Sequence, residues 1–274
     1  MDLQLTGKTA LVTGGSAGIG KGIARVLARE GCDVAICARR REPLEATAAE
    51  IRAESGRRVV AIPADLTRKE DAENFVTGAA KALGRIDILV NNAGSAPGGI
   101  LEVLDEAAWM QGLQLKFMGY VRCLKAALPI MVGQGGGRVV NLIGNDGVKD
   151  SYWEIVPGAC NAAGQNLTKA LAAQYGRLNV TVVAVNPGPV RTERWEGLVD
   201  AMARDMKLSH EEADQLAPRS IPLGRIAEVE EVANLVAYLA SPLAHFVNGS
   251  MIEIDGGQQK PLMDAARGAG APRP

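Results

Sequence analysis

The chain reads Thr13-Gly14-Gly15-Ser16-Ala17-Gly18-Ile19-Gly20 directly after a short apolar run, Thr9–Thr13, and directly before a stretch of helical period. Three spaced glycines in it have different physical roles. Gly14 permits a turn at positive φ, Gly18 lacks the Cβ that would block a pyrophosphate, and Gly20 allows the helix to lie close to the strand. The amides at the start of that helix then face the phosphates. In this strand-turn-helix context the glycine turn predicts a dinucleotide site.

The remaining sequence repeats the alternation of strand and helix. Strands are predicted at Thr9–Thr13, Asp33–Ala38, Arg58–Pro63, Ile86–Asn91, Arg138–Ile143, Val180–Asn186 and Ser250–Asp255. Helices are predicted at Gly18–Glu30, Pro43–Ser55, Lys69–Leu83, Glu106–Met131, Gly158–Gly176 and Glu228–Leu239. Several strands are too apolar to alternate, which is typical of strands covered on both faces. We therefore expect an α/β fold of the Rossmann type, a single domain with a doubly wound, parallel, seven-stranded sheet and helices on both faces.

Composition agrees with one domain, expected to span residues 1–260. The chain has 274 residues, 47% of them hydrophobic, which is enough for one substantial core. A charged, helix-prone segment, Glu193–Pro218, interrupts the strand-helix rhythm, and we expect it to act as a mobile lid. Residues 261–274 are rich in Gly, Ala, Pro and Arg and predict a flexible tail. The apolar residues of the lid fit either a hydrophobic ligand or packing within the lid itself: Trp195, Leu198, Met202 and Met206.

Other features of the sequence narrow the function classes. The formal net charge is −1 and basic residues are mixed with acidic ones, which argues against a nucleic-acid partner. No apolar run reaches the roughly 20 residues of a spanning helix, and the first residues do not resemble a signal peptide, so we expect a cytoplasmic protein without a membrane partner. Neither the four cysteines nor the two histidines form a metal-ligand pattern, so we expect reduced thiols and no metal.

The end of the second predicted strand indicates which dinucleotide binds. An acidic side chain there would accept hydrogen bonds from the ribose 2′-hydroxyl of NAD, but the sequence has Ala38 followed by Arg39. The forked guanidinium of Arg39 suits a 2′-phosphate, so NADP is favoured over NAD. The next two residues, Arg40 and Arg41, are expected to lie at the solvated start of a helix.

Further motifs follow the later strands: Asp65-Leu66, Asn91-Asn92-Ala93-Gly94, Asn186-Pro187-Gly188 with Thr192, Ile221-Pro222-Leu223-Gly224-Arg225 and Asp255-Gly256-Gly257. With these motifs the chain resembles the short-chain dehydrogenase/reductase family from Leu5 to Gly257. The resemblance implies that Asp65 contacts adenine, that Asn92–Gly94 supports the nucleotide and the sheet, and that Pro187–Thr192 flanks the nicotinamide. Together with the glycine turn and Arg39, the expected cofactor contacts are Gly14, Ser16, Gly18, Ile19, Gly20, Arg39, Asp65, Leu66, Asn92, Ala93, Gly94, Pro187, Gly188, Val190 and Thr192.

The same resemblance places unusual residues at the catalytic positions. The family uses an asparagine, a serine, a tyrosine and a lysine, which deliver a proton while nicotinamide delivers a hydride. Here these positions hold Lys116, Gly144, Pro157 and Asn161 in that order. Glycine and proline have no titrating group, and asparagine carries no charge, so the usual proton route is absent. Pro157 also suits the first turn of a helix, where a missing amide costs no hydrogen bond.

Three side chains are candidates to take over the proton transfer. Lys116 could bring an amine into the pocket from the opposite wall, as acid, base or imine-forming nucleophile; alternatively it points to solvent, from a helix that also carries Arg122 and Lys125. Asp146 either moves a proton or belongs to an ordinary turn, which we favour. Tyr152 either moves a proton or packs the loop with its neighbour Trp153. We expect Cys160 to be a small buried hydrophobe.

Three functions remain open at this point. The first is an oxidoreductase acting on a small carbonyl or alcohol with substitute catalytic groups. The second is a lyase or isomerase that uses the same pocket without net redox turnover. The third is a catalytically silent subunit beside an active homologue, since the resemblance implies a homodimer, a homotetramer or a hetero-oligomer built through the long helices Glu106–Met131 and Gly158–Gly176.

Overall fold

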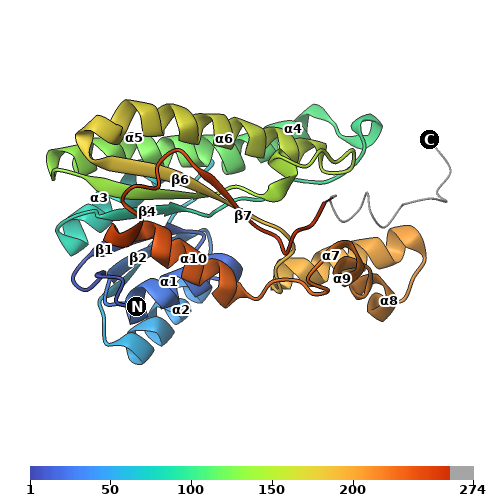
Figure 1. Ribbon diagram of the computed structural model, residues 1–274, viewed down its shortest axis with the longest axis horizontal. Helices are drawn as coiled ribbons and strands as arrows, with labels where there is room; N and C mark the ends of the chain where they lie inside the picture. Colours follow the sequence, from blue (N-terminus) through green and yellow to red (C-terminus); the bar gives the residue numbers. More distant parts are fainter. Residues whose placement is uncertain (260–274) are drawn as a thin grey trace.

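The computed structural model describes residues 1–259, apart from the side chains of Ala201, Asp205 and Ala217. The predicted tail, 261–274, lies outside the described residues. Within them the chain forms one α/β domain around a single sheet (Figure 1).

The sheet has seven parallel strands in the order β3-β2-β1-β4-β5-β6-β7. The strand order reverses between β1 and β4, so the connections leave a crevice at the carboxyl ends of these two strands, where ligands bind in open α/β sheets. The fold predicted from the sequence is confirmed. The strands are β1 Thr9–Thr13, β2 Asp33–Ala38, β3 Val59–Pro63, β4 Ile88–Asn91, β5 Gly137–Leu142, β6 Val180–Pro187 and β7 Met251–Ile254.

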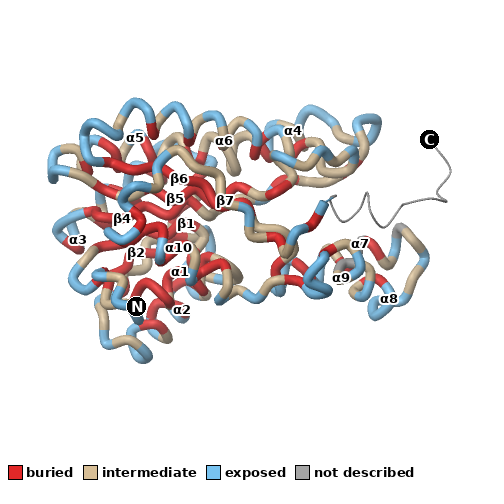
Figure 2. The backbone as a smooth tube through the Cα atoms, viewed as in Figure 1, coloured by how far each residue is buried: buried red, intermediate tan, exposed pale blue. Residues whose placement is uncertain are grey.

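Helices cover both faces of the sheet and enclose two apolar cores. One core lies between the sheet and α1, α2 and α10, and the other between the sheet and α3, α5 and α6. Figure 2 shows the buried residues concentrated along the strands and the inner sides of these helices. Because both faces are covered, β1 is buried at all five positions, as its apolar sequence requires. The helices are α1 Gly18–Arg29, α2 Arg41–Ser55, α3 Lys69–Leu83, α5 Met118–Gly133, α6 Ile155–Tyr175 and α10 Val229–Ala240.

One predicted helix is not continuous. Instead of a single helix over Glu106–Met131, the chain forms α4 at Glu106–Gly112, a π-helical turn at Leu113–Phe117, and then α5. The π-helical turn shifts the following residues by only a fraction of a helical turn. The hydrophobic periodicity of the sequence therefore does not reveal it. Lys116 lies within it.

The helix that carries Pro157 and Asn161 begins earlier than predicted. It starts at Ile155 instead of Gly158, which makes Pro157 its third residue. The first helical hydrogen bond runs from Gly158 N to Glu154 O at 2.8 Å. Pro157 therefore still occupies the first turn, where its missing amide has no partner to lose.

The predicted lid segment folds as three short helices, α7 Glu193–Met206, α8 His210–Asp214 and α9 Leu216–Ser220. They project from the end of the sheet body in Figure 1. Trp195, Val199 and Met202 form a small core of their own with neighbours that include Trp153 of the β5–α6 loop. The hydrophobic residues of this segment thus pack largely among themselves; its mobility stays a prediction.

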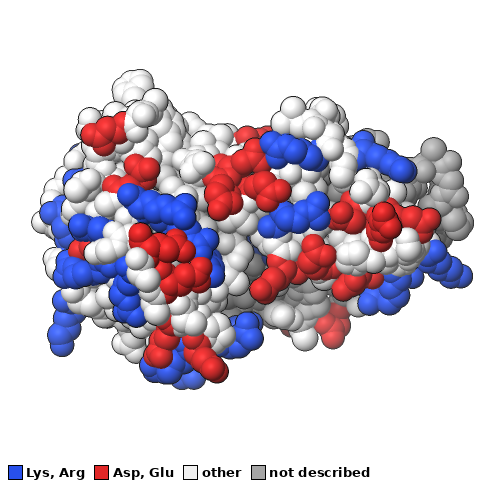
Figure 3. All heavy atoms as spheres, turned by 90° about the horizontal axis from the view of Figure 1, so that it is seen from below, with Lys and Arg blue, Asp and Glu red and all other residues white. Residues whose placement is uncertain are grey.

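One face of the molecule carries a mixed charge pattern. On the face in Figure 3, Lys and Arg are interspersed with Asp and Glu, without a continuous basic stripe. Among residues 1–259, no helix is both long and apolar enough to cross a membrane.

Candidate active site

A cavity of about 840 Å³ opens at the carboxyl ends of the strands. Its walls come from the glycine turn after β1, the end of β2, the loops after β4 and β5, and the segment from β6 into α7. Nearly all the predicted cofactor contacts border it: Gly14, Ser16, Gly18, Ile19, Gly20, Arg39, Leu66, Asn92, Ala93, Gly94, Pro187, Gly188, Val190 and Thr192.

The glycine turn has the geometry that its sequence predicts. Gly14 and Gly18 have φ of +69° and +52°, in the left-handed region that favours glycine. A Cβ on Gly20 would lie 2.2 Å from the Gly14 carbonyl oxygen, so only glycine lets the helix approach the strand this closely. Asn92 holds the turn from the side, donating from Nδ2 to the Thr13 carbonyl at 2.9 Å. The turn is therefore a fixed cradle with its backbone amides at the cavity.

The end of the cavity beside the carboxyl end of β2 carries positive charge. Arg39 and Arg40 both line it, so Arg40 is more than the solvated helix start that we expect from the sequence. Asp65 does not line the cavity, although its neighbour Leu66 does. Its Oδ1 accepts hydrogen bonds from the backbone N and the hydroxyl of Thr67 at 3.0 and 2.8 Å. These bonds and the nearby Arg39 lower the pKa of the Asp65 carboxyl against the opposing effect of its burial.

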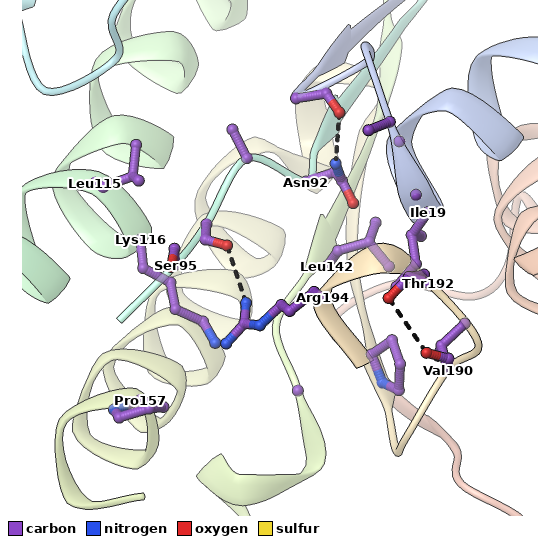
Figure 4. A pocket seen from close by; sticks show the side chains of 18 of the residues that line it. Ile19, Asn92, Ser95, Leu115, Lys116, Leu142, Pro157, Val190, Thr192 and Arg194 are labelled. Carbon is purple, nitrogen blue, oxygen red and sulfur yellow. Dashed lines mark hydrogen bonds between the residues drawn. The ribbon is translucent and has the colours of Figure 1, made fainter. Parts of the chain in front are cut away.

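Lys116 enters the cavity from the π-helical turn. Its side chain points away from Leu115 toward Arg194 (Figure 4), and its stem packs on Gly94, where a Cβ would lie 3.1 Å from Lys116 Cγ. Desolvation by burial lowers the pKa of the ammonium, Arg194 lowers it further, and Asp146 opposes the shift. Lys116 makes no side-chain hydrogen bond or ion pair with the described residues. Of the two orientations left open by the sequence, the side chain has the one that faces the cavity.

Asp146 and Asn161 occupy the space beside Gly144. Asn161 Nδ2 donates to Asp146 Oδ1 at 2.5 Å, and Asn161 is buried. Gly144 has φ +135°, and a Cβ there would lie 2.6 Å from Asp146 Oδ1 and 2.7 Å from Asn161 Nδ2. The glycine is therefore needed for this carboxylate-amide pair to form. Asp146 sits in a 3-10 turn, Asn145–Gly147, as its sequence context predicts, and it also borders the cavity.

The remaining candidate residues differ in whether they line the cavity. Tyr152 is 45% exposed and does not border the cavity, while Trp153 packs against Gly98 and the α7 cluster. Pro157 is buried and lines the cavity. Cys160 packs with Ala96 and Val156, and burial raises the pKa of its thiol, so it is the small buried hydrophobe expected from the sequence.

Several further polar residues of the cavity were not anticipated, among them Glu154, Arg194 and Gln258. Arg194 extends from the start of α7 across the cavity, and its Nη1 donates to the Gly94 carbonyl at 3.2 Å (Figure 4). In the sequence, its position two residues after Thr192, a predicted cofactor contact, could have identified it as a cavity residue. Gln258 follows β7 and receives a hydrogen bond from Asn145 Nδ2 at 2.8 Å; no local motif connects segments so distant in sequence.

The fold and this cavity match a known family. The model of the short chain dehydrogenases covers residues 8–203. The chain belongs to this family. It is 34% identical over 258 residues to the A-factor type gamma-butyrolactone 1′-reductase (1S-forming) of Streptomyces virginiae, spanning 92% of this chain and 96% of the relative.

Solved structures of short chain dehydrogenases superpose closely. L-Sorbose reductase of Gluconobacter frateurii, complexed with NADPH and L-sorbose, has a TM-score of 0.90 at 30% identity, over 96% of this chain and 100% of that one. A variant of the actinorhodin polyketide ketoreductase with NADPH has a TM-score of 0.89 at 33% identity, over 92% and 97% of the two chains. Short chain dehydrogenases of this group are oxidoreductases, and this chain shares their whole fold.

Proposed function

We propose that the protein is an NADP-dependent oxidoreductase that interconverts a small carbonyl compound and its alcohol, with Lys116 as the proton donor. The observation that carries the proposal is the position of Lys116, whose ammonium lies in the cavity without a hydrogen-bond or ion-pair partner among residues 1–259. It takes the place of the tyrosine that the family uses and that Pro157 replaces.

The cavity residues fit an NADP molecule. The glycine cradle would hold the pyrophosphate at the start of α1, Arg39 with Arg40 would hold the 2′-phosphate, and the segment from Pro187 to Thr192 would flank the nicotinamide. When bound as NADPH, the cofactor supplies a hydride to the carbonyl carbon. The NADPH complexes of the two similar reductases support this assignment.

The proton goes to the carbonyl oxygen from Lys116 Nζ. Its lowered pKa makes the ammonium a better acid than an exposed lysine, and its charge stabilises the alkoxide that forms as the carbonyl is reduced. Asp146, held by Asn161, raises the pKa of Lys116 and so favours its protonated form. Tyr152 has no part in this proposal, because it lies outside the cavity.

The test is NADPH consumption with a panel of ketones and aldehydes, comparing wild type with Lys116→Met and Lys125→Met. Lys125 is exposed on α5 and serves as the matched control. A general acid contributes about 10²- to 10⁴-fold, so Lys116→Met should lower kcat by that factor while Lys125→Met leaves it unchanged.

Two results would overturn the proposal. Equal activity of wild type and Lys116→Met would remove Lys116 from the mechanism. Absence of NADPH consumption with every carbonyl would favour the other two functions: substrate conversion with unchanged cofactor would indicate a lyase or isomerase, and co-purification with an active homologue would indicate a silent subunit.

A further inference from the structure

The substrate end of the cavity holds two cations that form no ion pair within the described part of the chain. Lys116 comes from the π-helical turn and Arg194 from the start of α7, and their side chains point toward one another (Figure 4). The neighbouring arginine, Arg191, does form an ion pair, with Asp214. Lys116 is partly buried and Arg194 is exposed at the cavity mouth, and two like charges that face each other are unfavourable until an anion joins them.

The carboxylates that line the cavity form no ion pair with these two cations within residues 1–259. Asp146 lines the same cavity, and its Oδ1 accepts a hydrogen bond from Asn161. Glu193 also borders the cavity and, like Arg194, is exposed to solvent. Desolvation by burial lowers the pKa of Lys116 and Arg194 lowers it further, although Asp146 and Glu154 act in the opposite direction.

Arg194 has hydrogen-bonding capacity to spare. A guanidinium carries five N–H donors, and the described contacts use one nitrogen, Nη1, on the Gly94 carbonyl. The remaining edge can take both oxygens of a carboxylate in parallel hydrogen bonds, which is the geometry that arginine favours. A lysine beside it offers only a point charge and a proton.

We propose that the substrate is an oxo acid, in which Arg194 binds the carboxylate and Lys116 serves the carbonyl oxygen next to it. The proposal rests on the oxidoreductase function given above and specifies its substrate class. Because the two cations face one another, the carboxylate must lie close to the carbonyl, as in a 2-oxo or 3-oxo acid. Leu115, Pro157, Trp195 and Leu198 line the same cavity and provide an apolar wall for the rest of the molecule.

The experiment compares 2-oxo and 3-oxo acids of increasing chain length with their methyl esters. We expect wild type to prefer each acid over its ester by about 10- to 100-fold in kcat/KM, the range for a charge-assisted hydrogen-bonded pair. Arg194→Met should abolish this preference by raising KM for the acids, and Arg194→Lys should restore only part of it. Arg219→Met is the matched control, because Arg219 is exposed on α9 and does not line the cavity.

Binding separates this proposal from the redox function. The affinity of each oxo acid and its ester is measured by calorimetry with NADP⁺ present, which needs no turnover. Acid-selective binding that Arg194→Met removes supports the substrate class even if no hydride moves. Equal binding or equal reduction of acid and ester, or an Arg194→Met variant with unchanged selectivity, overturns the substrate class while leaving the carbonyl reductase function intact.

Discussion

Lys116 combines a charge with an environment that disfavours charge. Burial removes water from the ammonium, and Arg194 adds repulsion, so the pKa of Lys116 lies below the ordinary value for lysine. Such a group gives up its proton more readily than an exposed lysine does, which is the property that a general acid needs.

The pH profile of reduction tests this property. Reduction requires the protonated ammonium, so its rate should fall as pH rises through the lowered pKa of Lys116, and alcohol oxidation should show the opposite trend. Because Asp146 raises the pKa of Lys116, Asp146→Asn should move both transitions to still lower pH. The asparagine keeps an oxygen that can accept the Asn161 hydrogen bond. A profile of kcat/KM that is unchanged in Asp146→Asn would contradict this coupling.

A second residue-scale prediction concerns cofactor choice. Arg39→Ala should weaken NADPH binding by about 10- to 100-fold, since a hydrogen bond to a charged group contributes roughly 1.5–3 kcal/mol, and should leave NADH binding nearly unchanged. Arg41→Ala is the control, because Arg41 pairs with Glu45 and does not line the cavity. Fluorescence titration of both nucleotides measures the effect; equal losses for NADPH and NADH would refute the role of Arg39.

At the scale of elements, two short segments shape the site. The π-helical turn Leu113–Phe117 carries Lys116, and its widened geometry is stabilised from outside: Arg122 Nη1 donates to the carbonyls of Gln114 and Leu66 at 2.9 and 3.0 Å. Insertions of this type often occur at functional sites because they change the face that a side chain presents. The glycine turn is the other segment, and it depends on close backbone contact.

Gly20→Ala tests the glycine turn. The new Cβ would meet the Gly14 carbonyl oxygen at 2.2 Å, so the helix must move away from β1, and we expect a loss of about 1–3 kcal/mol in the free energy of unfolding together with weakened nucleotide binding. Gly133→Ala is the control: it lies at the end of α5, a Cβ there would meet nothing within 4 Å, and alanine favours helix. Thermal unfolding with and without NADPH gives both quantities. Equal behaviour of the two variants would show that the close approach is not required.

At the scale of the whole molecule, a buried polar cluster ties distant segments together. Lys149, after β5, contacts Asp255 and the Gln258 carbonyl beyond β7, and it lies 3.2 Å from Glu253. The side chain of Asp255 is 6% exposed. Gln258 in turn donates to Ser220 Oγ at the end of α9 at 3.3 Å. The cluster thus connects the turn that carries Asp146, the end of the sheet and the α7–α9 segment.

Lys149→Met should destabilise the protein by about 3 kcal/mol, because it leaves the buried Asp255 carboxylate without its cation. Lys69→Met is the matched surface control: its pair with Glu73 is exposed, at 3.7 Å, and its loss should cost less than about 1 kcal/mol. Urea unfolding measures the difference. Lys149→Arg should recover part of the stability, and a Lys149→Met variant as stable as Lys69→Met would show that the cluster does not hold these segments together.

Local patterns in the sequence were sufficient for the fold and for the residues that line the cavity at the glycine turn. The strands Thr9–Thr13 and Asp33–Ala38 and the helix Lys69–Leu83 have the predicted bounds, because each is set by its own apolar pattern and flanking turn residues. The glycine turn follows β1 and Arg39 follows β2, and these two strands are parallel neighbours in the sheet. The turn and Arg39 therefore lie close together at the carboxyl ends of the strands. Asp65 shows the limit of this reasoning, since its side chain bonds to Thr67 instead of facing the cavity.

The substrate half was decided by the tertiary structure. Lys116 points into the cavity because of a π-helical turn that periodicity cannot detect, Asp146 and Asn161 meet only because the turn after β5 packs on α6, and Arg194 reaches Gly94 from a segment 100 residues away in the chain. Sequence alone determined which side chains are present and in which predicted segment of the chain each one lies. Which of them face one another is set by packing between elements, because contacts over long sequence separations leave no local pattern.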